Sequence, residues 1–107
     1  DNLNLQCISA IEVYPAATLQ CYNIKNTGYK GKNQMEARKE IMDSLMGFMT
    51  IKDDIDMLLK NADALDSLVC LLAAKDFIEG NVYYPEDPNT ARKEGWIWVR
   101  KRDGENV

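Results

Sequence analysis

The sequence predicts an α/β fold, and two kinds of segment support this prediction. Residues 7–14 and 95–101 are rich in β-branched and aromatic side chains. Strict alternation places apolar residues on both faces of residues 7–14, which is typical of a strand covered on both sides. Residues 62–80 read as one apolar helix with no polar stripe in its middle turns. Strands and a helix buried in this way are typical of α/β domains.

Further helices are predicted between the two strands. Residues 34–50 carry apolar side chains at helical spacing, and Asn33 followed by Glu36 resembles a capping box. Residues 51–60 add a second, shorter apolar face. The pattern therefore predicts three to four helices in all.

Prolines predict where the first strand ends and where a turn-rich connection lies. Pro15 ends the first strand, because proline donates no hydrogen bond to a ladder, and it suits the first turn of a short helix over residues 16–22. Residues 84–89 contain two prolines and are expected to form a turn-rich connection.

Length and composition indicate one ordinary globular domain. A chain of 107 residues, 46% hydrophobic and 28% charged, is sufficient for a single core, so residues 1–107 are taken as one domain. No apolar run approaches the roughly 20 residues that span a bilayer, and the first residues do not resemble a signal peptide. The three cysteines have no CxxC spacing and are read as reduced thiols. We expect a cytoplasmic protein that does not enter a membrane.

The absence of histidine narrows the possible chemistry. It excludes Ser-His and Cys-His nucleophile pairs and imidazole-ligated zinc, which leaves carboxylates, lysine and tyrosine. The net charge of −4 gives no overall attraction to nucleic acid. However, Lys25, Lys30 and Lys32 share one loop with Tyr29. This loop either contacts phosphates and bases or is simply a solvated basic loop.

Two carboxylates near the start of the long helix have two explanations. Asp63 and Asp66 project from one side of the helix, and acids are favoured there as caps and by the helix dipole, with Asn61 as an alternative cap. The second explanation joins them to Glu12, because a carboxylate in a covered strand is costly unless it is paired, hydrogen-bonded or bound to a metal. In the simpler interpretation, Glu12 occupies an exposed strand end. Together the three acids could hold one or two Mg²⁺ ions.

Several segments resemble, in order, motifs of one known family. They are IEVYPAATL at residues 11–19, the pair Tyr29 and Lys30, DALDSLVCLLAAKDFIEG at residues 63–80 and EGWIWV at residues 94–99. The family is catalogued as domain of unknown function 429, and its members are predicted RNase H-like nucleases related to RuvC-type resolvases. The resemblance covers most of the chain and is weakest between residues 32 and 59.

The resemblance implies a nuclease site held by metal ions. Glu12 would lie at the end of a core strand, and Asp63 and Asp66 would form the D-x-x-D pair of the last core helix. These three residues would be the catalytic metal ligands for Mg²⁺ or Mn²⁺, and Lys30 would contact a phosphate. Nucleic acid is the implied partner.

One departure from the family pattern limits the expected activity. The first catalytic Asp of the family lies on a strand of a three-stranded N-terminal meander that this chain does not contain. We therefore expect the C-terminal half of an RNase H-like domain, weakly active or inactive by itself. Its unpaired strand edge would favour a homo-oligomer.

The alternative function is a non-catalytic module. In that interpretation the acids are helix caps, and the aromatic strand and the methionine-rich helix face build an oligomer. Metal binding that depends on the acids would distinguish the two hypotheses.

Overall fold

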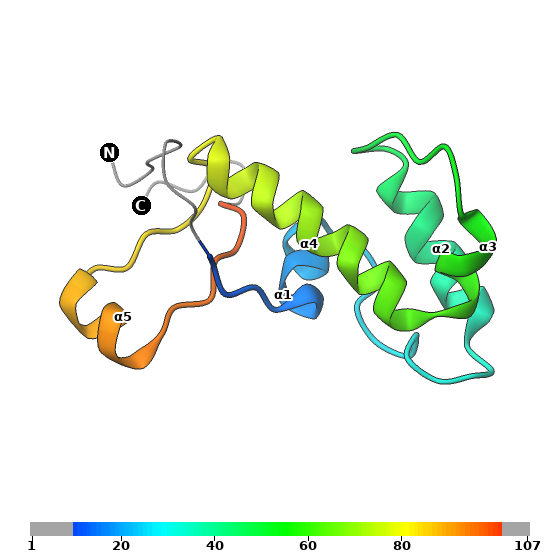
Figure 1. Cartoon of the computed structure of the whole chain (residues 1–107), viewed down its shortest axis with the longest axis horizontal. Helices are drawn as coiled ribbons and strands as arrows, with labels where there is room; N and C mark the ends of the chain where they lie inside the picture. The colour runs from blue at the N-terminus through cyan, green and yellow to red at the C-terminus, as the bar shows by residue number, and fades with distance from the viewer. Residues whose placement is uncertain (1–9, 102–107) are drawn as a thin grey trace.

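The computed structural model describes residues 10–101, and within that range the chain forms five helices and no sheet. The helices are α1 (Pro15–Cys21), α2 (Met35–Leu45), α3 (Ile55–Lys60), α4 (Ala62–Ile78) and α5 (Pro88–Glu94). Figure 1 shows α4 running along the molecule, with α2 and α3 at one end and α5 at the other. The long helix α4 therefore connects two different regions.

The predicted α/β fold is wrong for the described residues. Within the described range, residues 95–101 pair with other segments only through isolated bridges: a parallel one joins Ile97 to Glu12, and an antiparallel one joins Arg100 to Val82. A strand needs a partner along several residues, and each bridge here involves a single pair. Residues 7–9 of the first predicted strand lie outside the described residues.

The helix predicted over residues 34–50 is present but shorter. Helix α2 ends at Leu45, and turns follow in which the Gly47 N–H donates to the Ser44 carbonyl. Glycine is a poor helix former, which is consistent with an end before Gly47. The predicted capping box is also wrong, because Gln34 is the N-cap residue and its side chain makes no capping bond.

The start of α3 and the end of α4 follow from two residues with a left-handed backbone conformation. Asp54 has φ of 60°, a conformation that cannot continue a helix, so α3 begins at Ile55 and not at residue 51. The long helix predicted over residues 62–80 is confirmed as α4, which ends two residues before Gly80 (φ 74°).

Helix α5 was not predicted from the sequence. Asp87 is its N-cap residue and accepts hydrogen bonds from the backbone N–H groups of Asn89 (3.0 Å) and Thr90 (3.2 Å). Pro88 fits the first turn because that position needs no N–H donor. An aspartate before a proline thus starts a helix inside the predicted turn region. Helix α5 has no buried residue and packs against none of the other four helices.

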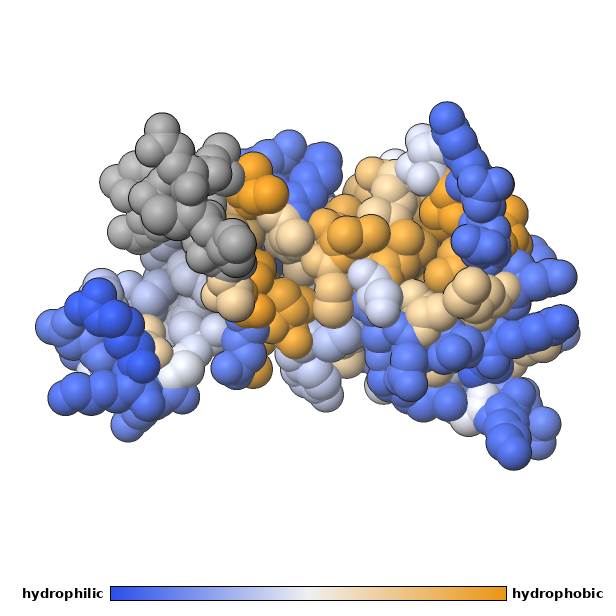
Figure 2. Space-filling view, viewed as in Figure 1, coloured by the Kyte–Doolittle hydropathy of each residue, from blue (hydrophilic) through white to orange (hydrophobic). Residues whose placement is uncertain are grey.

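The core lies where α4 meets α1, α2 and α3. Its fully buried apolar side chains come from α1, α2 and α4: Leu19, Ile41, Leu45, Leu65, Val69 and Leu72. Leu58 of α3 packs against them. One stripe of α4 stays uncovered, since Leu71 is 64% exposed and Ile78 is 52% exposed. Figure 2 shows apolar side chains over the middle of the molecule and hydrophilic ones over α5. No helix in the described range is long and apolar enough to cross a membrane.

Candidate functional site

Asp66 near the start of α4 is held by two consecutive loop residues. The Tyr29 hydroxyl donates to Asp66 Oδ1 at 2.7 Å, and the Lys30 ammonium forms an ion pair with Oδ2. The Asp66 side chain is 13% exposed, whereas that of Lys30 is 61% exposed. The structure therefore brings together two of the four residues singled out in the sequence, Lys30 and Asp66.

The loop that carries Tyr29 and Lys30 is fixed by a buried arginine on α2. Arg38 is 2% exposed, and its Nη1 donates to the carbonyls of Tyr29 (2.7 Å) and Gly31 (2.6 Å). Its Nε donates to the Leu59 carbonyl at the end of α3 (2.5 Å). A buried cation is tolerated when its donors are hydrogen-bonded, and here they tie the loop, α2 and α3 together.

Sequence reasoning missed Arg38 and the role of Tyr29. A signal for Arg38 existed, because it falls on the helical stripe that Ile41, Met42 and Leu45 define, where a charge is out of place. Periodicity gives no comparable signal for Tyr29, which is separated from Asp66 by 37 positions.

Asp63 is not the helix cap. The side chain of Asn61 caps α4 by accepting from the backbone N–H groups of Asp63 (2.9 Å) and Ala64 (3.3 Å). The alternative cap is thus confirmed, and the exposed Asp63 carboxylate is not needed for capping.

Hydrogen bonding to Asp66 raises the pKa of Lys30, and the charge on Asp63 raises it further. Both carboxylates therefore stabilise the charged form of Lys30.

Positive side chains gather next to this acid pair. A cavity of about 280 Å³, which we call the basic hollow, lies between the loop and the start of α4. Its charged lining consists of four cations and one acid: Lys30, Lys32, Arg38, Lys60 and Asp63. The Nε and Nη1 donors of Arg38 are already engaged, and the side chain is buried, so the exposed lysines are the groups that we expect to meet a ligand.

Glu12 lies in a different setting. It is exposed, its carbonyl accepts from the Trp98 N–H at 3.0 Å, and its carboxylate faces Gly95, where an added Cβ would lie 3.5 Å from Oε1. No three Cys, Asp or Glu side chains among residues 10–101 gather closely enough to hold a metal ion. Glu12, Asp63 and Asp66 thus do not form such a group there, and their catalytic role stays a prediction.

Two titratable groups that Asp66 influences are favoured in their neutral forms. Burial and the Asp66 carboxylate raise the pKa of the Tyr29 hydroxyl, so it keeps the proton that it donates. Burial also raises the pKa of the Cys70 thiol, and Asp66 adds to this effect. A raised pKa disfavours the thiolate, so the setting of Cys70 is not that of an activated nucleophile.

These features define a helical structure with a charged site at one end of its longest helix. The chain belongs to the family described as "Protein of unknown function (DUF429)", whose model matches residues 8–90. The family resemblance found in the sequence is confirmed, and the relationship to RNase H-like nucleases stays a prediction. No curated protein and no solved structure matches the chain.

Proposed function

We propose that this chain is part of a cytoplasmic, metal-dependent nuclease-like protein and that it binds the phosphate backbone of nucleic acid at the basic hollow. The observation that supports the proposal best is the pairing of Lys30 with Asp66 directly beside that hollow. Lysines that line a cavity next to carboxylates suit a phosphodiester, since ammonium groups bind the phosphate oxygens. The carboxylates of Asp63 and Asp66 would face the same phosphodiester.

The acid pair fits a divalent cation only in part. Mg²⁺ is usually held by one or two carboxylates together with water and substrate phosphates, so Asp63 and Asp66 meet the minimum. Both oxygens of Asp66 are already engaged, however, by Tyr29 and Lys30. Glu12 does not join the pair to make a three-acid group in the described range. No hydrolytic step follows from two acids alone, and Mg²⁺ or Mn²⁺ is proposed as a ligand that the pair shares with substrate.

The roles of the chain's own residues follow from their contacts. The exposed Lys30 side chain can turn from Asp66 to a phosphate, which would leave Asp66 Oδ2 open to a cation. Tyr29 would hold Oδ1 throughout, because its hydroxyl stays protonated. Arg38 would be a positioning residue, since it contacts the backbone of the loop and fixes where Lys30 starts.

Binding of fluorescent single- and double-stranded oligonucleotides, measured by anisotropy over a range of salt, tests the proposal. Lys30→Gln and Lys60→Gln should each weaken binding and lower the slope of log affinity against log salt by about one. Lys39→Gln is the matched control, because Lys39 is an exposed lysine on α2 that pairs with Asp43. Binding that is absent, or that all three variants weaken equally, would contradict the proposed site.

A Mn²⁺ titration by calorimetry, with and without oligonucleotide, tests the acids. Asp66→Asn and Asp63→Asn should each weaken Mn²⁺ binding, most clearly when oligonucleotide is present. Glu12→Gln should leave it unchanged if the pair acts without Glu12, and should weaken it if the three-acid prediction from the sequence is right. Metal binding that none of these substitutions affects would remove the metal from the proposal.

The second candidate is the non-catalytic oligomeric module, and one observation favours it. Leu71 and Ile78 lie seven positions apart on the exposed stripe of α4, where two apolar side chains face solvent. If this stripe joins two copies, sedimentation velocity should show a dimer that Leu71→Lys dissociates. A wild-type chain that stays monomeric at high concentration would rule out this candidate.

A further inference from the structure

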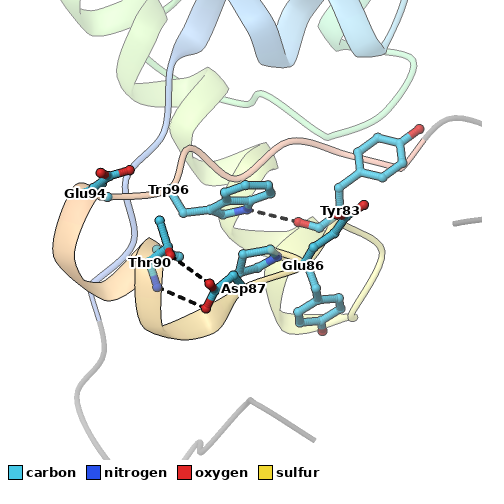
Figure 3. Close-up of a pocket in the computed structure, with 10 residues that line it drawn as sticks. Tyr83, Glu86, Asp87, Thr90, Glu94 and Trp96 are labelled. Atoms are coloured by element: carbon cyan, nitrogen blue, oxygen red, sulfur yellow. Dashed lines mark hydrogen bonds between the residues drawn. The ribbon is translucent and has the colours of Figure 1, made fainter.

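A second cavity lies at the opposite end of the molecule from the basic hollow, beside α5. It has a volume of about 630 Å³, within the range of pockets that hold small organic ligands. The segment before α5, α5 itself and the residues after it supply its walls (Figure 3). Three aromatic and three acidic residues line it: Tyr83, Tyr84, Trp96, Glu86, Asp87 and Glu94. Glu94 and Trp96 lie beyond the residues that the family model matches.

The aromatic wall is fixed in place. The Trp96 indole N–H donates to the Tyr83 carbonyl at 3.1 Å, as Figure 3 shows. The Tyr84 ring meets the Trp98 ring edge-on, with centroids 5.4 Å apart. Even so, Trp96 and Tyr84 remain 36% and 37% exposed. Large ring surfaces held in a defined position but open to solvent are ready to receive a ligand.

Among residues 10–101, the charges of the lining are all negative. Glu86, Asp87 and Glu94 line the cavity, and no lysine or arginine of that range does. Asp87 is held by α5, where its side chain accepts from the Thr90 hydroxyl at 2.8 Å and from two backbone N–H groups. Hydrogen bonding to Thr90 lowers the pKa of Asp87, and the nearby Arg92 acts in the same direction, so the carboxylate stays ionised. A phosphate or carboxylate ligand would be repelled here.

We propose that this cavity binds an organic cation, namely a guanidinium or ammonium group carried on an apolar stem. Such a group is attracted to the negative face of an indole and to carboxylates, and both are present in one cavity. The apolar stem would lie along the aromatic rings, as arginine and lysine stems do on apolar surfaces. This inference is independent of the nuclease proposal, since the two sites share no residue and bind ligands of opposite charge.

Titration of the ¹⁵N-labelled chain with Nα-acetyl-argininamide (argininamide below), whose only charge is the guanidinium, tests the inference. Nuclear magnetic resonance reports directly on the site through the indole N–H signal of Trp96. We expect a saturable shift of that signal and no comparable shift with Nα-acetyl-citrullinamide (citrullinamide below), the neutral analogue of nearly the same shape. A short peptide with one internal arginine is the second probe. Tighter binding of the peptide would favour a protein segment as the source of the cation, and equal binding would favour a small organic cation.

Substitutions show whether the residues that line the cavity are responsible for argininamide binding. Glu86→Gln, Glu94→Gln and Trp96→Leu should each weaken argininamide binding roughly two- to fivefold, and higher salt should weaken it further. Glu36→Gln on α2 is the matched control, because Glu36 is an exposed acid at the other end of the molecule. For Trp96→Leu, the backbone signals of α5 replace the lost indole signal. Absence of a saturable shift, equal binding of citrullinamide, or equal weakening by the control would overturn the inference.

Discussion

The two ends of the molecule are built on different physical principles. The helices α1 to α4 form a cluster around fully buried side chains such as Leu19, Ile41 and Leu65. The α5 arm, which we define as residues 83–96, has no buried residue in its helix and is shaped by local hydrogen bonds at Asp87 and Trp96. Long-range hydrogen bonds from the buried Arg38 therefore hold the basic hollow, whereas short-range hydrogen bonds shape the cavity beside α5.

Aromatic and charged contacts join the two regions. Trp98 packs edge-on against Phe77 of α4, with centroids 4.8 Å apart, and against Tyr84 of the arm. The Arg100 guanidinium lies 4.4 Å from the centre of the Tyr22 ring. The connection therefore passes through the end of α4, so substitutions on either side should have separable effects.

The largest effect is expected for Arg38→Met. Methionine keeps an apolar stem but leaves the carbonyls of Tyr29, Gly31 and Leu59 without the donors they now have. Losing a buried hydrogen-bond partner costs about 1–3 kcal/mol, and the bond to Tyr29 is buried while the other two are partly buried, so the three losses together should lower the free energy of unfolding by about 3 kcal/mol. Urea denaturation measures the change.

The neighbouring substitution Lys39→Met is its control. Lys39 is exposed and forms only a surface ion pair with Asp43, so its loss should cost less than about 0.5 kcal/mol. Equal effects of the two substitutions would show that Arg38 does not hold the cluster together. In Arg38→Met, oligonucleotide binding at the basic hollow should be lost. Argininamide binding at the cavity beside α5 should be unchanged.

The sequence predicts the locally determined features well. Helix α4 could be predicted because its apolar run, the Asn61 cap and the terminal Gly80 all lie within one stretch. The one-sided placement of Asp63 and Asp66 follows equally from helical spacing. The predicted strands failed because β pairing is non-local: residues 95–101 favour an extended backbone, but a ladder also needs a partner along several residues.

The candidate site was predictable only in part for the same reason. The pairing of Lys30 with Asp66 joins residues 36 positions apart, and the family resemblance, not residue spacing, singled out Lys30. The sequence places Glu12 with the acids because a carboxylate in a covered strand is costly, and the family resemblance supports this, whereas its position depends on its pairing with Ile97. No sequence motif marks the cavity beside α5. Its walls come from three consecutive segments, which α5 brings together.

A smaller, pH-dependent effect is expected where the two regions meet. The Tyr22 hydroxyl donates to Asp76 Oδ2 at 2.6 Å, and Asp76 is only 3% exposed. Tyr22→Phe removes this donor and should lower the free energy of unfolding by about 1–3 kcal/mol near pH 7. Urea denaturation of both proteins at several pH values measures the change.

The direction of the pH dependence follows from the pKa of Asp76. Burial raises this pKa above its usual value of 3.8, while the Tyr22 hydrogen bond and Arg100 oppose the rise. The folded state then holds the proton more tightly, so this contribution to stability is complete below pH 3.8 and is lost as the pH rises through the folded-state pKa. Tyr22→Phe should steepen the loss, and Asp76→Asn should abolish it. A stability difference from wild type that is independent of pH would contradict this account.

The smallest effect on global stability is expected for Asp87→Ala. Loss of an N-cap costs a helix about 1 kcal/mol, which a helix of seven residues without buried side chains cannot absorb, so α5 should unfold locally. Amide exchange should accelerate in α5 and stay unchanged in α4, and the urea midpoint should hardly move. Asp53→Ala is the control, since Asp53 is an exposed acid outside any helix. If α4 lost protection as well, the arm would be part of the cooperative core. Because α5 packs against no other helix, we expect its loss to abolish argininamide binding and spare the basic hollow.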